Sequence, residues 1–174
     1  MNEKNINPDD LMGDIVPEIN PEKLFDEKEY STIVLGSDEK SKHDEDNADY
    51  LTIIIGHATS REAKDEALSK LKENKAQAFM MQAISRIKNA DHKAATIAAC
   101  WETGLDFTDY LPQFIELIND SNYLVSLEAF TVIEEMAPNL TQEKVMQSIH
   151  QLENANHKGA LYADCIYFLK SLNF

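Results

Sequence analysis

The side chains best suited to chemistry are two cysteines and five histidines in a chain of 174 residues. Cys100 and Cys165 could pair as a disulfide, react as thiols or bind a metal. No histidine stands at a recognised metal-ligand spacing from another histidine, a cysteine or an acidic residue. The sequence also contains no Gly-rich phosphate loop and no Gly-x-Ser-x-Gly motif. We therefore predict no metal site and no cofactor.

Adjacent acidic residues are the remaining candidates for acid–base catalysis. Glu134 and Glu135 are neighbours in the chain, so they would point in different directions from a helix. Such neighbours are more typical of a solvated helix surface than of a catalytic pair of carboxyl groups. The sequence predicts that the protein has no catalytic residues and is not an enzyme.

The balance of charge excludes several classes of partner. The chain holds 31 acidic residues against 16 lysines and arginines, a net charge of −15. This balance argues against nucleic acid, because phosphate binding needs clustered lysine and arginine, and against an anionic membrane surface. The apolar runs are too short to span a bilayer, and the N-terminus does not resemble a signal peptide. We expect a cytoplasmic protein.

Two segments carry most of the negative charge. Residues 1–46 contain 14 acids and five lysines, and we interpret them as an acidic, mostly disordered arm. Within the arm, the β-branched stretch 30–35 could fold back on the rest of the chain. Residues 94–143 contain nine acids and no lysine or arginine. They form either an ordinary solvated surface or one that attracts a basic partner.

The remaining domain, residues 47–174, carries an internal repeat. Residues 89–95 and 154–160 are identical at five of seven positions, and the two cysteines share the same offset of 65. Further copies of the pattern lie near residues 59 and 121. The repeat is therefore about half of 65 residues long, which is the length of a helix pair. Aligning the copies places helix-capping residue types at one position, followed by small or apolar residues on one helix face. The aligned cap positions are Thr59, Asp91, Ser121 and Asn156.

A second set of helices is expected between the capped ones. Apolar residues recur at helical spacing within 79–87, 111–118 and 145–152, and residues 48–55 are the expected leading helix, ending at Gly56. The pattern predicts an all-α fold of about four helical hairpins stacked in sequence and sharing one core. Cys100 and Cys165 would lie two hairpins apart, beyond the ~7 Å Cα limit for a disulfide. We therefore expect two buried structural thiols.

The third hairpin resembles a HEAT repeat. Residues 110–120, Tyr-Leu-Pro-Gln-Phe-Ile-Glu-Leu-Ile-Asn-Asp, resemble the first helix and turn of that family, including the proline early in the helix. Val125, Ala129 and Ile133 resemble its second helix. The resemblance covers roughly residues 48–173 and implies a short, right-handed α-solenoid whose second helices line a concave protein-binding surface. One departure is that Ser126 occupies a position where HEAT repeats often carry an arginine, which removes the basis for a ladder of polar bonds.

The last expected helix, within residues 159–174, is apolar on more than one face. Terminal repeats usually present a polar outer face. This helix is therefore covered either by its neighbour and the chain end, or by a partner, a second copy or the arm. Tyr162, Tyr167 and Phe174 are the expected anchors, because aromatic side chains dominate interface hot spots.

These observations predict a non-catalytic module that binds another protein, for which a basic surface is one possibility. Two alternatives stay open: a subunit or relative of a HEAT-like enzyme of the lyase type, and a structural or regulatory protein that forms homo-oligomers through its C-terminal helix. The candidate protein-binding residues are Trp101, Glu102, Asp106, Asp109, Tyr123, Leu124, Glu128, Glu134, Glu135, Tyr162 and Tyr167.

Overall fold

The computed structural model describes residues 42–56 and 59–174, and all regular elements of this part of the chain are helices. The all-α prediction is confirmed, whereas almost the whole predicted arm lies outside the described residues. The elements are α3 (Lys42–Ile55), α4 (Arg61–Glu73), α5 (Gln77–Arg86), α6 (Ala90–Glu102), η2 (Thr108–Tyr110), α7 (Leu111–Leu117), α8 (Tyr123–Met136), η3 (Ala137–Asn139), α9 (Gln142–Glu153) and α10 (Tyr162–Ser171).

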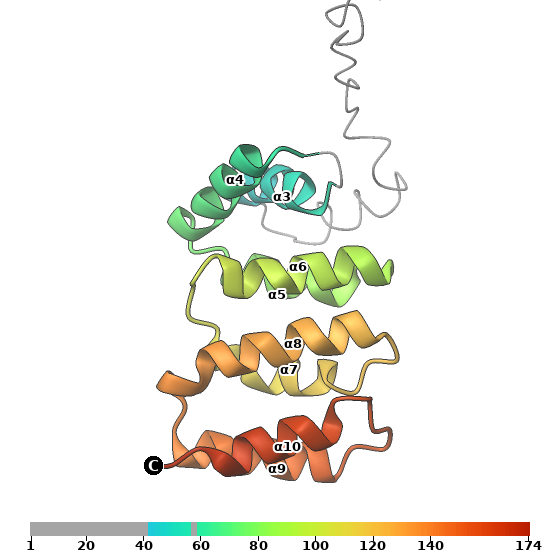
Figure 1. Cartoon of the computed structure of the whole chain (residues 1–174). Helices are drawn as coiled ribbons and strands as arrows, with labels where there is room; N and C mark the ends of the chain where they lie inside the picture. Colours follow the sequence, from blue (N-terminus) through green and yellow to red (C-terminus); the bar gives the residue numbers. More distant parts are fainter. Residues whose placement is uncertain (1–41, 57–58) are drawn as a thin grey trace, which may run out of the picture.

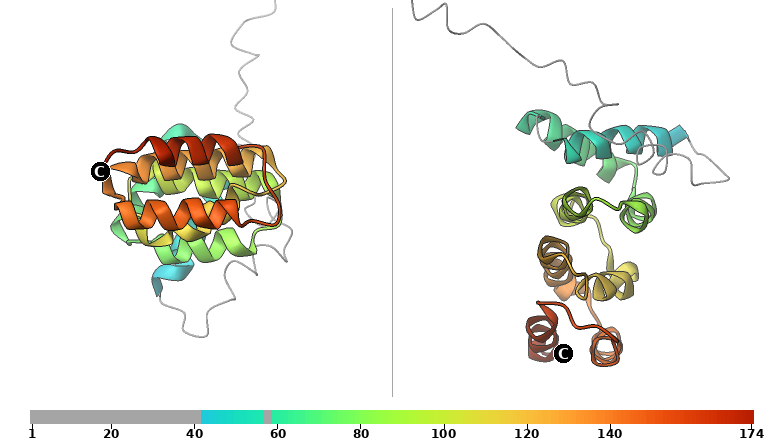
Figure 2. Two further views of the ribbon diagram at one scale, coloured as in Figure 1. Left: turned by 90° about the horizontal axis from the view of Figure 1, so that it is seen from below. Right: turned by 90° about the vertical axis from the view of Figure 1, so that its right-hand side faces the viewer.

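The helices form consecutive pairs that are stacked in chain order (Figure 1). Seen from the side, α5, α7 and α9 form one column and α6, α8 and α10 form a second column (Figure 2, right). The pair α3–α4 lies across the top of these columns, with its helices seen lengthwise where the others are seen end-on. Contacts between α3 and α6, α6 and α8, and α7 and α9 join successive pairs.

The core lies between the two columns and includes residues that the first three copies of the repeat place inward, whereas Ala160 and Asp164 of the fourth copy are exposed. Ala67, Ala99 and Ala129, which occupy one aligned position, are all buried at 1% exposure or less. Their small side chains let neighbouring helices approach closely, and the larger core residues of α5, α7 and α9 fill the remaining space. The largest fully buried side chains include Leu71, Met80, Ile97, Phe114, Ile133 and Leu152.

The leading helix α3 ends at Ile55, as predicted, but it begins at Lys42 rather than at residue 48. The expected boundary between residues 46 and 47 therefore falls inside this helix. Asp44 and Glu45, which were predicted to belong to the arm, lie in its first turn. There they interact favourably with the positive end of the helix dipole. Asn47 is also buried, and its side-chain oxygen accepts a hydrogen bond from Asn74 Nδ2 at 2.8 Å.

Three predicted caps are displaced by one or two residues. Ser60 caps α4, Asn89 caps α6 and Asn122 caps α8 through side-chain oxygens that accept bonds from backbone N–H groups. The predicted caps Thr59, Asp91 and Ser121 are wrong, because in each case a residue of equally suitable type one or two positions away takes the role.

The fourth predicted cap, Asn156, is also wrong, because α10 begins only at Tyr162 and has no side-chain cap. The reason is the packing of Gly159, whose backbone lies against the carbonyl of Ile118 so closely that a Cβ atom could not fit. Gly159 N donates to Asn119 Oδ1 at 3.2 Å. The loop before α10 is therefore held against the end of α7, and the helix can start only after this contact.

Candidate protein-binding surface

Large apolar side chains are exposed along the column of second helices. Trp101 is 38% exposed near the end of α6, and Tyr123 and Leu124 are 55% and 47% exposed at the start of α8. Tyr167 of α10 is 79% exposed. On the described residues of the other column, Met146 of α9 is the one comparable exposed apolar side chain. Three of the candidate aromatic residues, Trp101, Tyr123 and Tyr167, are thus open to solvent.

Trp101 connects α6 to α8. Its indole Nε1 donates a hydrogen bond to Glu128 Oε2 at 3.0 Å. Leu124, Glu128 and Glu135 follow one another at helical spacing on α8, so they share one face of that helix. The indole and this face of α8 form one continuous surface, which we call the α6–α8 face. Its residues are Trp101, Leu124, Glu128 and Glu135, with the exposed Tyr123 at its edge.

A hollow of about 180 Å³ lies beside the indole, between the C-terminal ends of α6 and α8. Buried apolar side chains, among them Cys100, Phe107 and Met136, line its floor. Asp106 and Glu135 supply two carboxylates to its lining, and both residues are exposed. The hollow thus combines an apolar base, an aromatic ring and negative charge.

Asp106 is held in the loop before η2 by its bonds to Thr108. Its Oδ1 accepts a hydrogen bond from Thr108 N at 2.9 Å and a second, short one from Thr108 Oγ1. These bonds lower the pKa of Asp106 below its ordinary value, and the charge of Lys144 lowers it further. The carboxylate is therefore ionised at neutral pH, and one of its oxygens is fixed by the loop.

Three of the nine acids in 94–143 are paired with lysines from neighbouring helix pairs, although the stretch itself has no basic residue. The prediction that the nine acids of this stretch are uncompensated is therefore wrong for three of them. Each lysine comes from an adjacent layer of the stack. The paired atoms are Lys64 Nζ and Glu102 Oε1 at 2.9 Å, Lys93 Nζ and Asp120 Oδ2 at 3.8 Å, and Lys144 Nζ and Asp109 Oδ1 at 3.2 Å.

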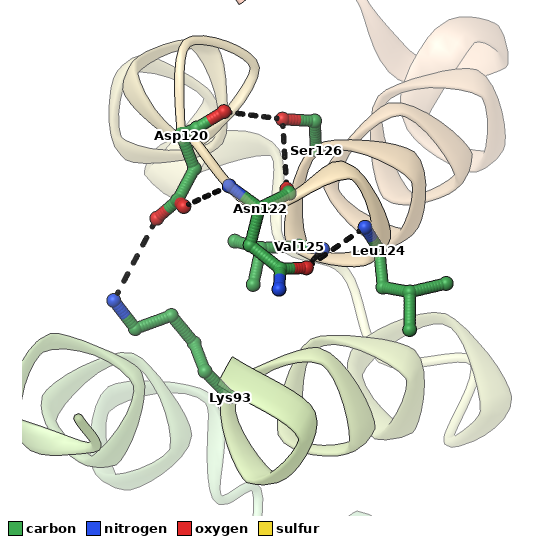
Figure 3. Close-up of polar contacts among 6 residues, drawn as sticks. All are labelled: Lys93, Asp120, Asn122, Leu124, Val125 and Ser126. Carbon is green, nitrogen blue, oxygen red and sulfur yellow. Dashed lines mark hydrogen bonds and ion pairs between the residues drawn. The ribbon is translucent and has the colours of Figure 1, made fainter. Parts of the chain in front are cut away.

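The pair at Asp120 belongs to the turn that begins α8 (Figure 3). Asp120 Oδ1 accepts a hydrogen bond from Asn122 N at 2.9 Å, while its other carboxylate oxygen faces Lys93 of α6. Asn122 Oδ1 in turn accepts bonds from the N–H groups of Leu124 and Val125. Asp120 thus links Lys93 of the preceding helix pair to Asn122, the residue that caps α8. This cap fixes where α8 begins and where Leu124 lies.

The pairing divides the candidate acids into two groups. Glu102 and Asp109 each pair with a lysine of a neighbouring layer, but the side chain of Glu102 is only 22% exposed whereas that of Asp109 is 94% exposed. No lysine or arginine of the described residues forms an ion pair with the other acidic candidates, and this second group carries the negative charge of the surface. Its members are Asp106, Glu128, Glu134 and Glu135.

No family model, curated protein or solved structure matches this chain. The surface must therefore be interpreted from its own geometry. No described helix has both the length and the apolar character to cross a bilayer. Within residues 42–56 and 59–174, no three His, Cys, Asp or Glu side chains gather as a metal site would require. The cytoplasmic location and the lack of enzymatic activity stay predictions.

The two cysteines are free and buried, as predicted. Burial raises the pKa of the Cys100 thiol well above its ordinary value. Burial also raises the pKa of Cys165 to about 12, with a smaller contribution from the charge of Glu134 on α8. Both thiols are therefore protonated at neutral pH and act as small core side chains.

The C-terminal helix separates its predicted anchors. Tyr162 is half-buried, and its ring lies under Lys158 Nζ at 4.3 Å from the ring centroid. Phe168 packs edge-on against Phe130 of α8 at 5.7 Å between centroids, which joins the last pair to the third. Tyr167 points away from these contacts and stays exposed. Of the two candidates on this helix, only Tyr167 is therefore free to act as an anchor.

Sequence reasoning missed the three lysines that join the layers. Their partners are 27 to 38 positions away in the chain, close to one repeat length. A search for opposite charges separated by one repeat could have detected these pairs. The hollow beside Trp101 was also missed, because it depends on how the loop 103–107 folds over the ends of two helices.

Proposed function

We propose that this protein is a non-catalytic binding module in which a short HEAT-like solenoid presents the α6–α8 face to another protein. The observation that carries the proposal is the exposure of Trp101, Tyr123 and Leu124 on adjacent second helices beside unpaired carboxylates. Exposed aromatic side chains surrounded by polar residues are typical of interface hot spots. The stacking of helix pairs and the proline at the start of α7 support the HEAT-like assignment.

The partner proposed for this face has a basic surface. Glu128 accepts the hydrogen bond of Trp101, Glu135 lines the hollow beside that residue, and residues 94–143 contribute no basic side chain. Complementary charge accelerates association and rejects acidic partners. Binding should therefore weaken as the ionic strength rises from about 50 to 300 mM, because screening shortens the range of these charges.

The test compares two variants of the full chain. Proteins retained by the immobilised wild type are identified, and the affinity of the purified partner is then measured. We expect the double variant Tyr123→Ala/Leu124→Ala to lose at least tenfold in affinity, about 1.4 kcal/mol. Met146→Ala, an equally exposed change in the other column, is the control and should bind normally. Equal loss in both variants, or in neither, would contradict the proposal.

A second candidate function is self-association through the last helix pair. Tyr167, Met146 and Phe174 are all exposed there. Residues 142–174 hold three acids and three lysines, so a second copy meets no net repulsion, unlike at the α6–α8 face. Light scattering of the wild type and of Tyr167→Glu tests this candidate. It requires an oligomer in the wild type that the variant loses while its circular dichroism is unchanged.

A further inference from the structure

We propose that the hollow beside Trp101 receives an arginine side chain of the basic partner. The inference rests on the proposed function and specifies what the partner must offer at this face. Three independent features of the hollow point to a cation: the ends of two helices, two carboxylates and an aromatic ring.

The first feature is the convergence of the C-terminal ends of α6 and α8. The last carbonyl groups of a helix carry partial negative charge, which a basic side chain in the final turn usually offsets. The helices α4, α5, α9 and α10 each have such a residue in the last turn. The helices α3, α6, α7 and α8 have none, and of these four α6 and α8 end at the hollow.

The second feature is the pair of carboxylates, Asp106 and Glu135, in the lining. Asp106 is held by Thr108 with its pKa lowered, so it is charged when the partner arrives. Two lysines approach the hollow without lining it: Lys72 Nζ lies near Gly104, and Lys144 acts on Asp106 from α9. Among the described residues neither lysine forms an ion pair with Asp106 or Glu135, and Lys144 pairs with Asp109 instead. These carboxylates are therefore left for an incoming group.

The third feature is the orientation of the indole. Its Nε1 edge is bound to Glu128, which holds the ring in place while the residue stays 38% exposed. Tryptophan is the best aromatic partner for a cation, and a planar guanidinium can stack on it while it pairs with a carboxylate. The apolar floor around Phe107 and Met136 suits the methylene stem of an arginine.

The size of the hollow agrees with one inserted side chain. A buried cavity of about 150 Å³ is enough to hold a benzene molecule. The hollow, at about 180 Å³, has room for a guanidinium and part of its stem, but not for a folded element. The recognised group is therefore a single arginine on the partner surface.

The experiment uses a short probe, the peptide Ac-Gly-Arg-Gly-NH2, and the full chain labelled with 15N. Trp101 is the single tryptophan, so its indole N–H gives one unambiguous NMR signal. We expect a saturable shift of this signal with the arginine peptide. The neutral isostere with citrulline should cause no shift, and the lysine peptide should bind about threefold more weakly or worse, because an ammonium cannot stack or pair in two places.

Two matched variants identify the site. Glu135→Gln should weaken the arginine peptide by about threefold or more. Glu116→Gln makes the same change of charge on the exposed surface of α7 and should leave binding unchanged. Equal binding of arginine and citrulline peptides, or equal effects of the two variants, would overturn the inference.

The result is separable from that of the proposed function. One outcome is that the Tyr123→Ala/Leu124→Ala variant loses the partner while Glu135→Gln keeps full affinity for both partner and peptide. This outcome would support the proposed binding face and contradict the arginine pocket. The other outcome is that the peptide binds through Glu135 but the affinity of the partner does not depend on the α6–α8 face. This outcome would support the arginine pocket and contradict the proposed function.

Discussion

The indole nitrogen of Trp101 donates to a carboxylate oxygen of Glu128 at 3.0 Å, which fastens the end of α6 to the middle of α8. We expect Glu128→Ala to free the indole and to cost about 0.5–1.5 kcal/mol of stability. The emission of the single tryptophan should shift to longer wavelength, because water replaces the lost acceptor. Glu134→Ala, on the same helix but without a bond to the indole, should leave the emission as in the wild type.

Gly159→Ala should be strongly destabilising. A Cβ atom at this position would overlap the carbonyl oxygen of Ile118, and backbone atoms cannot move aside as a flexible side chain can. We expect a loss of about 1–3 kcal/mol in urea-induced unfolding. Ala160→Ser, an exposed change at the next residue, should stay within about 0.5 kcal/mol of the wild type. A tolerated Gly159→Ala would show that the loop does not pack against α7 as described.

Two asparagines that look alike in the sequence should behave differently. Asn122 accepts bonds from the N–H groups of Leu124 and Val125, so Asn122→Ala should cost about 0.5–2 kcal/mol. Asn156 lies in the loop before α10 and caps no helix, so Asn156→Ala should be close to neutral. Thermal unfolding of the two variants checks the difference. Similar losses in both would support the repeat alignment over the structure.

Stability should fall at alkaline pH because of the buried thiols. The pKa of Cys165 is about 12 in the folded protein, against an ordinary value near 9, and that of Cys100 is also raised. Above pH 9 the unfolded chain loses thiol protons that the folded protein keeps, so alkali favours unfolding. The stabilising contribution is complete below about pH 8 and is lost between pH 9 and 12. The slope contributed by each thiol approaches about 1.4 kcal/mol per pH unit.

The measurement for this prediction is urea unfolding at several pH values between 7 and 10.5. Cys165→Ala should lower stability at pH 7, since it leaves a small cavity, but it should also flatten the decline above pH 9. In the wild type, a thiol reagent should react with neither cysteine before unfolding and with both after it. Rapid reaction of the native protein at pH 8 would show that the thiols are not buried.

The lysines that bridge the layers should contribute little individually. Lys93 and Asp120 are 22% and 23% exposed at 3.8 Å, so their coupling energy in a double-mutant cycle should be below about 1 kcal/mol. The cycle uses Lys93→Met and Asp120→Asn. A larger effect of Asp120→Asn alone is expected, because the carboxylate also accepts a bond from Asn122 at the start of α8.

The sequence by itself determined the helical content, the pairing of helices and the inward face of the first three second helices. The reason is local: apolar and small residues recur at the period of a helix, and the pattern recurs at the period of a hairpin. Ala67, Ala99 and Ala129 are buried as this periodicity requires, and the thiols of Cys100 and Cys165 follow the same rule.

Only the tertiary structure decided where the last helix begins and which acids remain available for a partner. Gly159 shares its aligned position with Ala94 inside α6, yet its contact with Ile118, 41 positions earlier, keeps it out of the helix. Glu102 and Glu135 are both acidic residues near the end of a second helix, but Lys64 from another layer pairs with the first and leaves the second at the hollow. Such choices depend on distances between residues of different repeats, and a pattern within one repeat contains no information about them.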